Sequence, residues 1–403
     1  MTSMPLHDGR LRWAGDRVPI TILLDDPTPC RNPMWYEQPD QGHVAVVPNA
    51  FTEKFADLIE RTGAAGKFSV IPCPGARGRI DAGVPDVPPE DLAVFLRLVR
   101  ERIAPRWDIC PELLTHYKAL DLATMRLLPE REDAWAAHQD EASLTAYISC
   151  ALQILRNAGL EPTGVTSPWS FGCEVEDAYA TAISTGLREV CDIHCGWYFL
   201  HCDGQAPSVA PRVMRLDPPT GTALVSIVSG CEDDFAWPTQ GGAPAALDML
   251  LTSDGSGGRL AELYAHGSPL VFHTHWQSLF SNGTGAGLAA FEELCRRINR
   301  TWADYVRWTS ARELADYCAA RAATCLRAAD DGRRLIVNAP LTCSSFTFRV
   351  SMPAGAHGLY LAGDALERLP DGDAPLDEGT WRYHAGEALI CVPLRDGMEL
   401  AWQ

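Results

Sequence analysis

The stretch VPITILLDDPTP, residues 18–29, decides the fold class of this chain. Residues 18–24 form a nearly continuous apolar run, which is typical of a strand buried on both faces of a parallel sheet. Two carboxylates, Asp25 and Asp26, follow at once. Buried carboxylates side by side repel each other, and a metal ligand beside a general base would resolve that conflict. A turn is the alternative, because Asp-Pro is common in turns.

Further apolar runs alternate with amphipathic segments along the chain. The runs are 67–72, 107–115, 163–167, 191–200, 223–229 and 269–275. The segments with helical periodicity are 50–62, 89–103, 140–158, 174–187 and 286–300. Strands separated by helices predict parallel pairing through right-handed crossovers. We therefore expect an α/β fold, and seven runs suit a closed (β/α)7 barrel better than an open sheet.

The pattern changes towards the C-terminus. After about residue 333, short extended runs are separated by turn-forming clusters such as LPDGDAP. This pattern predicts an antiparallel β domain, a sandwich. We expect a barrel domain over 1–330, whose helical stretch 301–330 joins it to an accessory domain over 331–403.

Composition limits the partners of the chain. The formal net charge of −18 argues against nucleic acid and anionic membranes, which require a basic surface. We see no apolar stretch of membrane-spanning length and no apolar signal core, so we expect a cytoplasmic protein. The 14 cysteines lack a regular framework spacing, and most of them are expected to be buried thiols. This includes those of CDIHCGWYFLHC (191–202), where structural zinc is the less favoured interpretation.

Polar residues follow several of the predicted strands. Asp25 and Asp26 end the first, His116 the third, and His273 and His275 the last. Because the carboxyl ends of barrel strands share one rim, we expect these side chains to meet there. A structural, hydrogen-bonded histidine is the alternative for His116.

The last strand carries two histidines in PLVFHTHWQS (269–278). His273 and His275 share one side of an extended chain, and the barrel interior suits them better than the helix layer. One of them would be a general acid or base, and the other would support it by hydrogen bonding. Trp35, Trp169 and Trp276 lie near the same rim, where they either stack on a sugar or fill the core.

These motifs resemble the polysaccharide deacetylase superfamily, metal-dependent carbohydrate esterases on a distorted seven-stranded β/α barrel. The family's Asp-Asp motif corresponds to LLDDP, its second strand to GKFSVIP and its last strand to LVFHTHWQ. The resemblance implies that Asp25 is the catalytic base, Asp26 a metal ligand and His273 the general acid. It covers about residues 18–300 and leaves the C-terminal domain outside the shared catalytic unit.

Two positions depart from the family pattern. His116 in THYKAL matches the first histidine of the family's His-x-x-x-His motif, and Leu120 stands at the second. We therefore predict that His138, in the loop before the helix at 140–158, supplies the missing ligand. TSPWSFG keeps the proline and an aromatic residue of the family's fourth-strand motif but lacks its arginine.

The sequence thus predicts a hydrolase that removes an acyl group from a sugar-like substrate. A divalent metal, with zinc expected, would be held by Asp26, His116 and His138. Two alternatives stay open: a glycoside hydrolase that pairs Asp25 or Asp26 with Glu174, Asp233 or Asp234, or a non-catalytic sugar-binding relative. The expected partner is a small molecule or an oligosaccharide, and a homo-oligomer is possible.

Overall fold

The predicted strands of the first domain are present and run parallel to one another. The computed structural model describes residues 13–30, 46–232, 247–329, 333–352, 357–370, 372, 374–384 and 386–403. The parallel strands are β1 (Val18–Asp25), β2 (Gly66–Val70), β3 (Trp107–Pro111), β6 (Gly164–Thr166), β7 (Cys195–Cys202), β9 (Thr222–Ser229) and β11 (Leu270–His275). Each of them overlaps one of the predicted apolar runs.

The strands are grouped into two sheets. The first has the order β10-β11-β1-β2-β3, where β10 is Cys231–Glu232, and β12 (Val306–Trp308) also pairs with β1. The second has the order β6-β7-β9-β8, where β8 (Arg212–Asp217) is antiparallel. Single parallel bridges, Ile109↔Pro162 and Glu112↔Thr166, link the two sheets at β3. The described residues therefore form a mixed α/β structure in which the ladders do not make one continuous ring.

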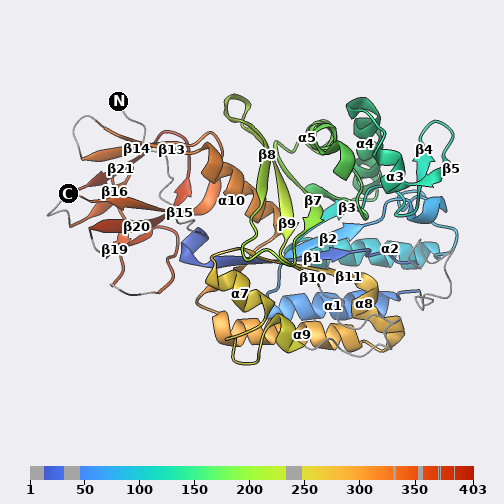
Figure 1. The fold of residues 1–403 in the computed structure, drawn as a ribbon, viewed down its shortest axis with the longest axis horizontal. Helices are drawn as coiled ribbons and strands as arrows, with labels where there is room; N and C mark the ends of the chain where they lie inside the picture. Colours follow the sequence, from blue (N-terminus) through green and yellow to red (C-terminus); the bar gives the residue numbers. More distant parts are fainter. Residues whose placement is uncertain are drawn as a thin grey trace.

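Helices cover the outside of these strands, as the alternating pattern predicts (Figure 1). The helices α1 and α9 lie along one side, below β1 and β11 in Figure 1, whereas α4 and α5 lie on the other side. Their bounds are α1 (Asn49–Thr62), α2 (Pro89–Leu98), α3 (Glu132–Ala136), α4 (Glu141–Asn157), α5 (Glu176–Cys191), α6 (Leu247–Leu250), α7 (Arg259–Ala265), α8 (Trp276–Phe280), α9 (Ala286–Trp302) and α10 (Ala311–Ala323).

Alternation along each strand separates two apolar clusters. On β1, Ile20, Ile22 and Leu24 pack in the cluster beneath the helices, whereas Leu23 belongs to the second cluster, which continues through α10 into the C-terminal domain. Because strand side chains alternate, Asp25 lies on the same side as Leu23. The same rule puts His273 and His275 of β11 on the side of Val271, another member of the second cluster.

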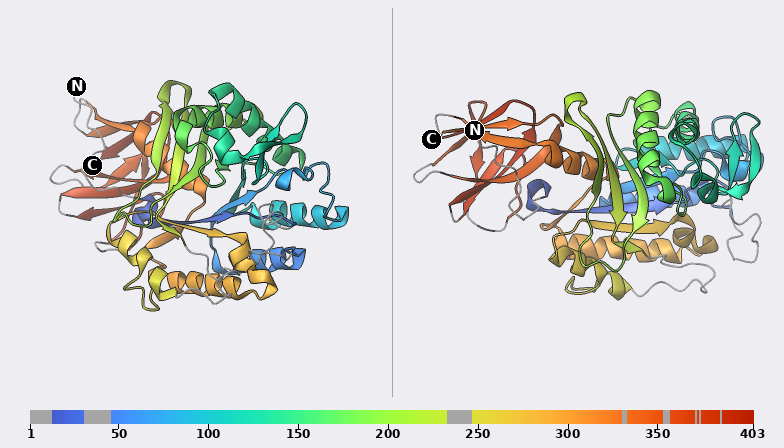
Figure 2. Two further views of the ribbon diagram at one scale, coloured as in Figure 1. Left: turned by 45° about the vertical axis from the view of Figure 1, so that its right-hand side comes forward. Right: turned by 45° about the horizontal axis from the view of Figure 1, so that its top comes forward.

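The C-terminal residues form two sheets in which most pairings are antiparallel, as the short extended runs of this region predict. One has the order β13-β14-β21-β16-β17, and the other has the order β15-β20-β19-β18. Their bounds are β13 (Cys325–Ala328), β14 (Arg334–Asn338), β15 (Cys343–Ser351), β16 (Leu359–Leu361), β17 (Asp364–Ala365), β18 (Glu367–Arg368), β19 (Thr380–His384), β20 (Glu387–Leu394) and β21 (Met398–Trp402). Both further views show α10 between these C-terminal sheets and the parallel strands (Figure 2).

Three features differ from the sequence prediction. The stretch 301–330 is not wholly helical, because it contains β12 and β13, and β13 already pairs with β14 of the C-terminal sheets. A hairpin of β4 (Lys118–Asp121) and β5 (Arg126–Arg131), and the antiparallel strand β8, were not expected. β5 and β8 are largely exposed and β4 is only four residues long, so none of the three has the apolar run that revealed the buried strands. Among the described residues, no helix is both long and apolar enough to cross a membrane.

Candidate functional site

Three polar side chains converge where β1 and β3 end. The Nε2 atom of His116 lies 3.1 Å from Oδ1 of Asp26 and 3.2 Å from Oε1 of Glu112. All three residues are buried, with exposed fractions of 5% or less. Their donor atoms lie within 4.8 Å of one another, a spacing that suits a metal ion. The other ring nitrogen of His116, Nδ1, is buried and lacks a hydrogen-bond partner in the part of the chain that is described.

The backbone turns sharply to present these groups. Asp26, His116 and Trp169 all have positive φ angles, of 67°, 50° and 51°. L-residues rarely adopt this left-handed conformation, and such strain concentrates at functional sites. The Asp26 N–H donates to Oε2 of Glu112 over 2.7 Å, so Glu112 also fixes the turn that carries Asp26.

A buried carboxylate, Glu132, holds the backbone of His116 in place. Oε1 of Glu132 accepts hydrogen bonds from the backbone N–H of Leu114 and Thr115 and from the Tyr147 hydroxyl, over 3.2, 2.8 and 2.6 Å. Its Oε2 accepts from the N–H of His116 over 2.8 Å. Glu132 begins α3, directly after the β4–β5 hairpin, so the hairpin positions the carboxylate that holds the His116 backbone.

A second group surrounds Asp25 beside the first. The ammonium group of Lys67 contacts Oδ1 of Asp25, and both side chains are nearly inaccessible to water. Nε2 of His273 lies 2.9 Å from Oδ2 of Asp25. The Ser69 hydroxyl lies 3.3 Å from Oδ1 of Asp25 and 2.7 Å from Oε2 of Glu112, which links the two groups. The ring of His275, half-buried at the strand end, lies 4.7 Å from that of His273.

The charges of the first group favour a cation between the two carboxylates. Burial raises the pKa of Asp26 to about 6, and the neighbouring Glu112 charge adds to this effect. Burial alone would lower the pKa of His116, but the Asp26 and Glu112 carboxylates raise it to about 9. Burial opposes ionisation of Glu112, yet His116 and Lys67 hold the Glu112 pKa well below its ordinary value. The negative charge of the two carboxylates, which keeps a proton on His116, would also attract a metal ion.

The structure brings together most of the predicted site residues. Asp25, Asp26, His116, His273 and His275 lie in these two groups. His138 is exposed in the turn after α3, and the third member of the group around Asp26 and His116 is Glu112.

The predicted tryptophans divide three ways. Trp169 is half-buried, with its ring centroid 4.7 Å from that of His116 and the Arg131 guanidinium 4.5 Å from its own. Trp276 is fully buried against Phe51 and Phe55 of α1, so the prediction that it contacts a substrate is wrong. It follows His275 directly and turns into the helix layer as α8 begins. Trp35 lies outside the described residues, as do Asp233 and Asp234.

Sequence reasoning missed Glu112 and Lys67. The prediction sought a further ligand only after His116, at Leu120 and then at His138, whereas Glu112 stands four residues before His116. Leu120, the position considered before, is buried in the core and pairs with Leu127 in the hairpin. A signal for Lys67 was available, because a lysine inside an otherwise buried strand needs a partner for its charge.

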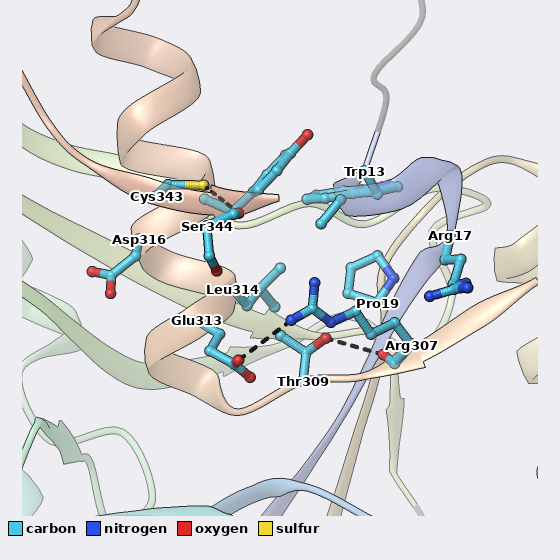
Figure 3. Close-up of a pocket in the computed structure, with 12 residues that line it drawn as sticks. Trp13, Arg17, Pro19, Arg307, Thr309, Glu313, Leu314, Asp316, Cys343 and Ser344 are labelled. Carbon is cyan, nitrogen blue, oxygen red and sulfur yellow. Dashed lines mark hydrogen bonds and ion pairs between the residues drawn. The ribbon is translucent and has the colours of Figure 1, made fainter. Parts of the chain in front are cut away.

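A cavity of about 90 Å³ lies elsewhere, where the start of β1 meets α10 (Figure 3). Trp13, Pro19 and Leu314 give it an apolar lining, and Arg307 and Glu313 lie 3.7 Å apart at its edge. Because Asp25 ends β1 and the cavity lies at its beginning, the cavity is separate from the candidate site.

Comparisons with known proteins leave the function open. Neither a protein-family model nor a curated protein matches the sequence. An exo-β-1,4-mannosidase from Opitutaceae bacterium strain TAV5 aligns in structure over 74% of this chain and 63% of its own, at 15% identity and a TM-score of 0.34. The chain thus spans less than two thirds of that enzyme.

A second solved structure is the α-fucosidase of Thermotoga maritima in complex with fucose. It aligns over 92% of this chain and 85% of its own, at 12% identity and a TM-score of 0.33. At scores and identities this low, neither alignment establishes an activity for this chain.

Proposed function

We propose that this chain is a metal-dependent hydrolase that removes an acyl group from a carbohydrate-like substrate, on a distorted seven-stranded β/α barrel. One observation carries the proposal. Asp26, Glu112 and His116 form a metal-type group, meaning that their donor atoms are spaced for a metal ion, and this group lies beside a separate acid–base pair, Asp25 and His273. This division of labour is what the resemblance to polysaccharide deacetylases implies.

Contacts at two places between the sheets support a closed barrel. The bridges at Ile109 and Glu112 join β3 to the region of β6 on one side. On the other side, β10 follows β9 after the single residue Gly230 and pairs with β11. The Gly230 N–H also donates to the carbonyl of Val271 over 3.1 Å. Within both sheets, the strands that these contacts connect run parallel, as a barrel whose strand ends share a rim requires.

The metal-type group fits a small divalent ion. In a tetrahedral zinc site with bonds of about 2.0–2.1 Å, ligand atoms lie about 3.4 Å apart. The distances of 3.1 and 3.2 Å from His116 to the two carboxylates are close to this spacing. An ion held by Asp26, Glu112 and His116 would supply a Lewis acid for the acyl oxygen and for water.

The other polar residues handle protons. Lys67 and Ser69 stabilise the negative charge of Asp25, which is the form that can accept a proton from water. His273 lies within hydrogen-bond reach of Asp25, and His275 is the more exposed histidine. We assign the return of a proton to the leaving amine or alkoxide to one of these two histidines.

Metal content tests the proposal most directly. We expect one equivalent of a transition metal in the native protein after loading with zinc and dialysis, and its loss in Glu112→Gln. Glu174→Gln, at an exposed position, is the matched control and should keep the metal. The native protein should then release acetate from acetylated amino sugars, and a chelator should stop it.

Two other outcomes would favour the alternatives. Sugar hydrolysis that survives the chelator would favour a glycoside hydrolase, since these enzymes need two carboxylates across a cleft and no metal. Sugar binding without metal or turnover would favour a non-catalytic relative.

A further inference from the structure

The His273 ring lies between two different sets of groups. Its Nε2 atom faces Oδ2 of Asp25 at 2.9 Å. Its Nδ1 atom faces Sγ of Cys202 at 3.5 Å and Oε1 of Glu232 at 3.7 Å. Cys202 ends β7, Glu232 ends β10 and His273 lies on β11. The metal-type group of Asp26, Glu112 and His116 contains none of them.

Asp25 decides which nitrogen of His273 carries the proton. A carboxylate paired with Lys67 can only accept a hydrogen bond, so in the neutral ring Nε2 bears the hydrogen. The lone pair of Nδ1 then points towards the thiol and the carboxylate. A carboxylate that fixes one nitrogen of a histidine, with the other nitrogen turned to electron-rich groups, is the usual support for a metal-binding histidine.

We propose that Cys202, Glu232 and His273 form a second metal site, distinct from the one proposed above. Zinc bonds of about 2.3 Å to sulfur and about 2.0 Å to nitrogen place those two atoms about 3.5 Å apart. The Cys202–His273 distance is 3.5 Å and the Glu232–His273 distance is 3.7 Å, so both distances from His273 are close to those of a tetrahedral site. All three donor atoms lie within 4.8 Å of one another.

The two sites differ in the ions they suit. Two carboxylates and one imidazole accept Mn²⁺ or Zn²⁺, whereas a thiolate favours thiophilic ions such as Zn²⁺, Cd²⁺ or Co²⁺ over Mn²⁺. Cys202 is exposed and half of the Glu232 side chain is exposed, so ions reach the site from solvent. On binding, the Cys202 S–H bond breaks, the proton passes to water and the sulfur lone pair forms the bond to the metal.

Occupation of the second site would engage Nδ1 of His273. A histidine whose two nitrogens contact Asp25 and a metal has no nitrogen left for proton exchange. An excess of a thiophilic ion is therefore expected to slow the hydrolase while leaving the first site loaded. This consequence, unlike the site itself, rests on the proposed function.

Cobalt titration of the metal-free protein tests the site without an activity assay. A cysteine thiolate bound to Co²⁺ gives a charge-transfer band in the near ultraviolet, which carboxylate and imidazole ligands do not produce. We expect this band in the native protein, with two equivalents of Co²⁺ bound. Cys202→Ser should lose the band and one equivalent, whereas Cys173→Ser, at another exposed cysteine, should keep both.

Further variants separate this proposal from the proposed function. Glu112→Gln should lose one equivalent of Co²⁺ but keep the thiolate band. In Glu232→Gln, the affinity for the Co²⁺ ion that gives the band should fall by about tenfold or more, as expected when a group that supports a metal is lost. A native protein without the band, or a band that persists in Cys202→Ser, would overturn the second site. The native protein could instead bind a single equivalent of Co²⁺ that gives the thiolate band and that Glu112→Gln retains. In that case the first site is wrong and the second site stands.

Discussion

Lys67 and Asp25 form an ion pair in which the lysine side chain is fully buried and the carboxylate is 6% exposed. Both charges lose their hydration there, and mutual attraction compensates only when the geometry is good and other hydrogen bonds are made. Ser69 and His273 supply those additional contacts to Asp25. The lysine ammonium also lies 5.1 Å from the centre of the Phe199 ring.

Replacing Lys67 by methionine should destabilise the fold. The change keeps the approximate volume but leaves the buried Asp25 charge without its counter-ion, and we expect a loss of about 3–5 kcal/mol in the free energy of unfolding. Urea denaturation measures this. Lys54→Met, at an exposed position of α1, is the matched control and should change stability by less than about 0.5 kcal/mol. Equal effects of the two variants would contradict the importance of the pair.

Replacing Glu132 by glutamine should impair the metal site while the fold persists. An amide retains one acceptor oxygen but turns an N–H₂ group towards the backbone donors that now hold His116. We expect a loss of about 10–100-fold in metal affinity, as for other residues that orient a metal ligand. Isothermal titration with zinc measures this affinity. Tyr147→Phe, which removes only one of the donors to Glu132, should have the smaller effect.

The sequence predicts those parts of the fold and the site that depend on the burial of strands and on their direction. Apolar runs revealed the parallel strands, and the rule that strand ends share a rim brought Asp25, Asp26, His116, His273 and His275 together. Alternation placed His273 and His275 on one side of their strand. Glu112 was missed because the further ligand was sought only after His116 in the sequence.

Other features had no local signal. The function of Lys67 depends on a carboxylate on the neighbouring strand, and that of Glu132 depends on a hairpin whose short strands carry no continuous apolar run. The burial of Trp276 follows from the turn after His275, where the chain leaves the strand and begins a helix. Such pairings between distant segments are set by the three-dimensional fold.

Two tryptophans near the strand ends should behave differently when replaced by alanine. Trp276→Ala should lower the free energy of unfolding by about 3–5 kcal/mol, because it empties a fully packed position. Trp169→Ala should have a smaller effect on stability but should weaken substrate binding by up to about tenfold, in line with the modest energy of aromatic stacking. Thermal unfolding and the KM separate the two effects. A large KM change in a stable Trp276 variant would return that residue to the site.

Asp108 should make stability depend on pH. Burial raises the pKa of this carboxyl to about 6, although the Arg312 N–H and the side chains of Ser310 and Thr163 stabilise its charge. The folded state therefore holds the proton more tightly than the unfolded chain, whose pKa is 3.8. It follows that the free energy of unfolding falls as pH rises between these two values and is constant above them.

Asp108→Asn removes this titration and keeps an acceptor for the Arg312 N–H. The variant should gain stability relative to the native protein as the pH rises from about 4 to 6, by up to about 3 kcal/mol. Urea denaturation at several pH values measures the difference. A difference that stays constant across this range would show that Asp108 does not titrate with the raised pKa.

Asp25→Asn should separate turnover from metal binding. Asp25 contacts Lys67, Ser69 and His273 but belongs to a different group from Asp26, Glu112 and His116, so the first metal should remain bound. Turnover should fall by about 100-fold or more, because an amide cannot accept the proton of the attacking water. Metal analysis and acetate release on the same sample test both statements. Loss of the metal together with activity would mean that Asp25 is itself a ligand, and the assignment of Asp25 as base would then be wrong.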